Sequence, residues 1–187
     1  MENLLFISSL FLWGLMVFNI LLTLGLARRI SRQFPKMESL KPGQPAPDFT
    51  AWTLDGEPVT RAAYAGKETA FIFVSPTCGP CREEVPKLDL LRPQAEANGL
   101  LLVLVSGSGE EETRKFLEEL GSTLPVLVAP PERTSFMKDY KAMATPSFCW
   151  IGHNGKVQRS GVGSFELGDQ LKNYFRNGEK EVMSKAK

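Results

Sequence analysis

The stretch from Phe71 to Pro86 constrains the fold of this chain more than any other segment. Its apolar beginning, rich in Phe, Ile and Val, predicts a buried strand over residues 70–75. A charged segment of helix-forming residues starts at Cys81. The turn between them reads Cys78-Gly79-Pro80-Cys81. The sequence therefore predicts a strand, two closely spaced cysteines and a helix in direct succession.

This spacing gives the two cysteines different chemical roles. Two intervening residues at the start of a helix bring both sulfurs close enough to form a disulfide. The first thiol lies beside unpaired backbone N–H groups and the positive end of the helix dipole, which favours a thiolate. A thiolate is the species that attacks a disulfide. We therefore predict that Cys78 is the nucleophile and Cys81 the resolving thiol, and that Pro86 kinks the helix without ending it.

A zinc site is the main alternative for a C-x-x-C pair, but it needs further ligands. The chain has 3 cysteines and 1 histidine in all. Of the two residues left, Cys149 is expected to be a small buried hydrophobe, with a third redox thiol as the alternative. His153 is expected on the surface of a turn. We expect no bound metal or other cofactor.

The N-terminal segment predicts a membrane anchor. No charged residue occurs between Leu4 and Ala27, and about 20 apolar residues suffice to cross a bilayer as a helix. The start, Met1-Glu2-Asn3, is not basic, and Gly25-Leu26-Ala27-Arg28 is a poor cleavage site, so an uncleaved anchor is favoured over a signal peptide. We assign residues 1–27 to a transmembrane anchor, 28–45 to a linker and 178–187 to a flexible tail.

Two arguments about topology conflict. Basic residues follow the span, and the positive-inside rule would place the remainder of the chain in the cytoplasm; these residues are Arg28, Arg29, Arg32, Lys36 and Lys41. A membrane-anchored dithiol is, however, most useful when it faces an oxidising compartment.

The remaining sequence alternates between strand and helix patterns. Strands are expected over residues 49–53, 58–59, 70–75, 100–105, 125–129, 147–151 and 156–161, and helices over 61–65, 81–97, 110–120, 132–140 and 164–176. Ser108 with Glu111 fits a capping box, and Pro93 is expected to bend or split its helix. The pattern predicts an α/β fold with a mixed central sheet flanked by helices. The net charge of +1 argues against nucleic acid as a partner.

Four blocks of residues between about 41 and 177 resemble the thioredoxin superfamily, in particular its membrane-anchored TlpA/ResA-like branch. They are Gly43–Phe49 with Leu54-Asp55-Gly56, the cysteine pair with Pro86, Thr145-Pro146, and Gly155-Lys156-Val157 with Gly161-Val162-Gly163. The approach Ser75-Pro76-Thr77-Cys78, together with the anchor, is most similar to MauD-like proteins, which serve in methylamine dehydrogenase maturation and are implicated in disulfide formation.

The resemblance implies a thioredoxin-like domain over residues 46–177 with a cis Pro146 lying against the dithiol. It also implies that a substrate peptide pairs with the backbone of the preceding residue. The residues expected to contact substrate are Thr77, Gly79, Pro80, Thr145 and Pro146. Two positions depart from the pattern, because Thr77 replaces the usual Trp and Ile72 replaces the buried Asp of cytosolic thioredoxins.

The resemblance implies a membrane-anchored thiol–disulfide oxidoreductase that acts on protein disulfides and exchanges electrons with a thiol redox partner. It also favours an extracytoplasmic domain and a role in maturing a protein there. Two alternatives stay open. The Gly43–Phe49 block is shared with peroxiredoxins, which would make the chain a thiol peroxidase. Sco-like relatives suggest a copper chaperone that would use the cysteines with His153.

Overall fold

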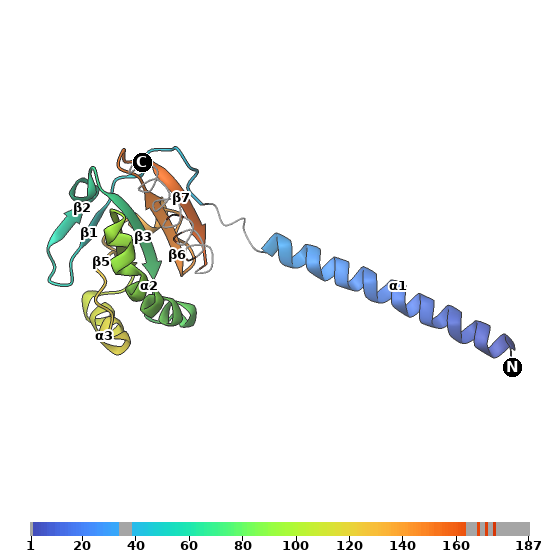
Figure 1. Cartoon of the computed structure of the whole chain (residues 1–187). Helices are drawn as coiled ribbons and strands as arrows, with labels where there is room; N and C mark the ends of the chain where they lie inside the picture. The colour runs from blue at the N-terminus through green and yellow to red at the C-terminus, as the bar shows by residue number, and fades with distance from the viewer. Residues whose placement is uncertain (1, 34–38, 164–167, 169–170, 172–173, 175–187) are drawn as a thin grey trace, which may run out of the picture. The chain divides into compact units, whose positions relative to one another are not determined.

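The computed structural model describes residues 2–33, 39–163, 168, 171 and 174 (Figure 1). The chain divides into two compact units, Met1–Met37 and Glu38–Lys187, and each is described by itself. Most of the helix expected over residues 164–176, and all of the tail over 178–187, lie outside the described residues. The three described residues in that range, Gly168, Leu171 and Tyr174, are helical.

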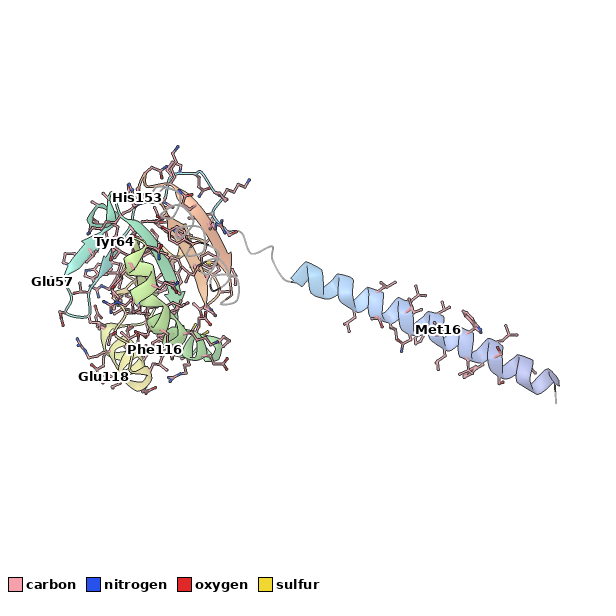
Figure 2. The ribbon with its side chains drawn as sticks, in the orientation of Figure 1. Met16, Glu57, Tyr64, Phe116, Glu118 and His153 are labelled. Carbon is pink, nitrogen blue, oxygen red and sulfur yellow. The ribbon has the colours of Figure 1, made fainter. Side chains whose placement is uncertain are left out.

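The first unit is a single helix, α1, which runs from Glu2 to Gln33. It contains a stretch, Ile7–Leu26, that is long and apolar enough to cross a membrane by length and composition. Every side chain described in this stretch is exposed, and they stand out all round the helix, as Figure 2 shows near Met16. An apolar surface on all sides is typical of a helix whose solvent is lipid.

The second unit is built on a seven-stranded sheet with the order β2-β1-β5-β4-β3-β6-β7. The strands are β1 (Thr50–Trp52), β2 (Pro58–Thr60), β3 (Glu68–Val74), β4 (Leu100–Ser106), β5 (Val126–Val128), β6 (Ser147–Ile151) and β7 (Val157–Val162). β3 is parallel to β4, and β4 to β5, whereas β6 is antiparallel to both β3 and β7. The expected mixed sheet is therefore confirmed.

The helices of this unit are η1 (Arg61–Tyr64, a 3-10 helix), α2 (Gly79–Ala97), α3 (Glu110–Leu120) and α4 (Phe136–Asp139). α2 continues through both Pro86 and Pro93 as one helix, so the expected split at Pro93 does not occur. α3 has the predicted bounds and ends at Gly121, whose φ of 63° is left-handed.

Two local predictions are wrong. The N-cap of α3 is Gly109, without a side-chain cap; the Ser108 N–H instead donates to the Ser106 hydroxyl, which also accepts from Thr113. α4 is shorter than the helix expected over 132–140, because the Pro130 carbonyl accepts hydrogen bonds from two following N–H groups and forms turns there.

Two apolar clusters cover the two faces of the sheet. One joins α2 and α3 to the face that carries Ile72 and Val74, and the other joins α4 to the face that carries Phe71 and Phe73. This division follows from the period of two along β3. The expected core residues Phe71, Phe73, Phe148 and Trp150 are all at most 3% exposed.

The segment from Leu40 to Ala46 lies along β7. Gly43 donates to the Val157 carbonyl, Ala46 donates to the Gly155 carbonyl, and the Ser160 hydroxyl donates to the Leu40 carbonyl. Leu40 is 7% exposed, so the chain is already packed onto the sheet at this point.

Candidate active site

The cysteine pair lies where β3 ends and α2 begins. Cys78 is the N-cap of α2, with an extended backbone conformation, and its N–H donates to the Ser75 carbonyl over 3.1 Å. Pro80 occupies the first turn of α2, where the missing N–H of proline leaves no hydrogen bond unmade. The local sequence thus fixes both cysteines at the positive end of a helix.

The two thiols have different environments. Cys78 is partly exposed, whereas Cys81 is 0% exposed and belongs to the apolar cluster under α2. Partial burial alone would raise the pKa of Cys78, but hydrogen bonds from the side chains of Cys81 and Thr145 and from the Cys81 N–H lower it below its ordinary value. Burial, followed by the hydrogen bond to Cys78, raises the pKa of Cys81 to about 12.

The loop before β6 completes the site. β6 pairs with β3 so that Ser147 lies opposite Phe73, which brings the preceding residues beside the cysteine turn. The Thr145–Pro146 peptide bond is cis, as expected. The Cys78 thiol donates to the Thr145 carbonyl oxygen over 3.3 Å. Residues 67 positions apart in the sequence therefore meet at the reactive sulfur.

Three more of the expected site residues surround Cys78 at the surface. Thr77, Gly79 and Pro80 are all exposed. The Thr77 hydroxyl lies 3.1 Å from that of Ser75, within hydrogen-bonding distance. Cys78 is thus reached from solvent through small or polar neighbours, where thioredoxins carry a large indole.

Arg82 has a defined role that the sequence did not reveal. Its Nε donates to the Pro76 carbonyl over 3.2 Å, its Nη1 pairs with Glu119 on α3 over 2.7 Å, and its guanidinium carbon lies 5.5 Å from the centre of the Phe116 ring. These contacts tie the turn before Cys78 to α3.

The burial of Glu84 on α2 was also not predicted from the sequence. Glu84 is 7% exposed, and its carboxylate lies 3.4 Å from the Lys87 ammonium. The signal was available, because Cys81, Val85 and Leu88 define the buried face of α2 and Glu84 lies on that face at helical spacing.

The structure separates Cys149 from the dithiol. Cys149 is 0% exposed and belongs to the cluster on the opposite face of the sheet from Cys81. Burial raises its pKa to about 12. The sheet lies between the two thiols, so the buried-hydrophobe interpretation holds and a third redox thiol beside the pair does not form.

His153 also lies far from the cysteines. Its Nε2 is 3.4 Å from the carboxylate of Glu68, the first residue of β3. Cys78 lies beyond the other end of this strand, after its last residue, Val74. A strand of this length spans about 20 Å. Figure 2 shows His153 and Phe116, the neighbour of Arg82, at opposite ends of the unit. The copper site that would combine His153 with the cysteines is therefore not formed.

Comparison with known proteins agrees with this geometry. A family model described as Redoxin matches residues 41–176. The thiol-disulfide oxidoreductase ResA of Geobacillus thermodenitrificans is 27% identical over 137 residues, which are 73% of this chain and 78% of ResA. The methylamine utilization protein MauD of Methylobacillus flagellatus is 30% identical over 121 residues, 59% of this chain and 58% of MauD.

A solved structure shows the same fold. The crystal structure of a Chlorobium tepidum protein, described as a candidate thiol:disulfide interchange protein DsbE, superposes with a TM-score of 0.63 at 26% identity. The match covers 73% of this chain and 99% of that one.

Proposed function

We propose, from the premise that this chain belongs to the redoxin family and is a thiol–disulfide oxidoreductase, that it exchanges electrons with protein disulfides through Cys78 and Cys81. The observation that carries this proposal is the asymmetry of the pair: Cys78 is partly exposed with a lowered pKa, and Cys81 is fully buried with a raised one. Only one sulfur is both accessible and nucleophilic.

The reaction proceeds in two exchanges. The Cys78 thiolate attacks a client disulfide, its S–S bond breaks, and the departing client sulfur takes up a proton. Cys81 then loses its proton and attacks the Cys78 sulfur, which releases the second client thiol. The client gains two electrons and two protons, and the protein is left with a Cys78–Cys81 disulfide. With an oxidised protein and a reduced client, the same steps run in reverse.

The residues around Cys78 supply the client's binding surface. An extended client segment would lie across the exposed Thr77, Gly79 and Pro80 on one side and against the half-buried Thr145 on the other, where backbone can pair with a peptide. Pro146 is buried, and its carbonyl already accepts a hydrogen bond from the Gly163 N–H, so its contribution to the client site is to hold Thr145 beside Cys78.

The client assignment is tested by trapping. With Cys81→Ser, the mixed disulfide has no resolving thiol, so client proteins are expected to stay covalently joined to Cys78 on non-reducing gels. Cys78→Ser is the matched control and is expected to trap none. Equal trapping by both variants would overturn the assignment of attacking and resolving roles.

We further propose that α1 anchors the chain in a membrane as a single span, with the dithiol domain outside the cytoplasm, where it serves in maturing another protein. The length and apolar surface of Ile7–Leu26 support the span. A reporter enzyme that is active only outside the cytoplasm, fused after the last residue, is expected to be active. Activity only of a cytoplasmic reporter would refute the orientation.

A further inference from the structure

We propose that α1 pairs with α1 of a second copy of this chain, through a seam formed by Leu12, Leu15, Asn19, Leu22 and Leu26. This inference rests on the membrane placement proposed above. The successive spacings of four and three residues are those of coiled-coil a and d positions, which bring side chains onto one face of a helix. All five side chains are exposed.

Asn19 distinguishes this face from the rest of an apolar helix. It lies seven residues from Leu26, the nearer end of the apolar stretch, which is about 10 Å along the helix. A short amide side chain cannot reach the bilayer surface over that distance. In hydrocarbon, where no water is available, its donors and acceptor need protein partners.

The helix itself leaves this need unmet. Thr23 satisfies its own hydroxyl by donating to the Asn19 backbone carbonyl over 2.8 Å, and lies 3.5 Å from the Asn19 side-chain oxygen. Among the residues that the structure describes, none accepts a hydrogen bond from the Asn19 side-chain nitrogen. The amide therefore has a donor available for another chain.

A second copy is the partner that fits. A primary amide carries both donors and an acceptor, so two of them can bond reciprocally. Copies of one chain insert in the same direction, which places both Asn19 residues at the same depth of the bilayer. A single asparagine at an a position is also the feature that fixes register and strand number in parallel coiled coils. The seam around it offers only leucine for packing.

Cross-linking of the full-length chain in membranes tests the geometry. In a background of Cys78→Ser, Cys81→Ser and Cys149→Ala, Leu22→Cys places a thiol on the seam, and Leu21→Cys places one on the other side of the helix. Mild oxidation is expected to give a disulfide-linked dimer from Leu22→Cys and little from Leu21→Cys. Equal yields from the two positions, or a Leu22→Cys cross-link to a different protein, would overturn the proposal.

Asn19 is tested with all native cysteines present, by co-purification of two differently tagged copies in mild detergent. Asn19→Leu is expected to weaken the dimer about 5- to 30-fold, as for an interhelical hydrogen bond in model helices, and Asn19→Gln to retain most of it. Thr23→Val is the matched control and should retain the dimer. An Asn19→Leu dimer as strong as the unmodified one would refute the role of the amide.

Extraction of membranes at alkaline pH tests the dimer and the membrane placement separately. A chain that stays in the membrane pellet but does not pair refutes the dimer alone. A chain that is released into the supernatant refutes the membrane placement, and with it the dimer.

Discussion

The difference in thiol reactivity can be worked out from the site and measured directly. At pH 7, a thiol whose pKa is about 12 is ionised in about one molecule in 100,000. The pKa of Cys78 lies below its ordinary value of 9.0, so at least about one molecule in 100 carries the thiolate. The thiolate population of Cys78 therefore exceeds that of Cys81 at least about 1,000-fold. A thiolate of higher pKa is intrinsically more nucleophilic, which reduces the expected ratio of alkylation rates to at least about 30-fold, before burial slows Cys81 further.

The assay uses Cys81→Ser and Cys78→Ser, each with one active-site thiol, and follows iodoacetamide labelling by mass spectrometry between pH 5 and 10. Serine keeps a hydroxyl that can donate to Cys78, so the environment of the remaining thiol changes little. Labelling of Cys78 should pass half of its plateau rate below pH 9, whereas labelling of Cys81 should still be rising steeply at pH 10. Rates within tenfold of each other at pH 7 would refute the assignment of roles.

Two further predictions follow from the same contacts. Arg82→Ala removes the hydrogen bond to Pro76 and the ion pair with Glu119, and should slow client reduction. The loss of stability should be less than about 2 kcal/mol, since the ion pair is exposed. Glu119→Gln leaves the Pro76 contact and should keep the rate of client reduction, so equal slowing by both variants would contradict a role of Arg82 in positioning the turn before Cys78. Because the folded pKa of Cys149 is raised to about 12, its contribution to stability is complete below pH 9 and is lost between pH 9 and 12. In Cys149→Ala, the free energy of unfolding should fall less steeply between pH 9 and 12, by up to about 1.4 kcal/mol per pH unit, as measured by urea denaturation at each pH. The same slope in both proteins would contradict a pKa of Cys149 raised by burial.

The sequence predicted well those elements whose signals are local. The bounds of α3 and β6 agree with the expected ones, because a heptad-like apolar stripe ended by Gly121 and a strongly apolar run after Pro146 are complete within a few residues. α4 was overestimated because hydrogen bonds to the Pro130 carbonyl, which depend on turn geometry, compete with helix formation at the same residues.

The part of the site that depends on local sequence was also predictable. The roles proposed for Cys78 and Cys81 depend on a helix start that is visible in the sequence. The Thr145 carbonyl at the Cys78 thiol depends on the pairing of β6 with β3, which no local pattern contains and only the family resemblance implied. Arg82 was missed because its partners on α3 and in the preceding turn meet only in the folded chain.

The register between β3 and β6 also decides which thiols can exchange. Cys149 lies opposite Phe71, and both side chains enter the cluster on the α4 side of the sheet. Its neighbour Phe148 lies opposite Ile72, in the cluster that contains Cys81. A shift of β6 by one residue would turn Cys149 toward the dithiol, because side chains alternate between faces along a strand. Since the register holds Cys149 on the far face, the mixed disulfide on Cys78 meets only Cys81 as an internal thiol, and the exchange can end in only one intramolecular disulfide.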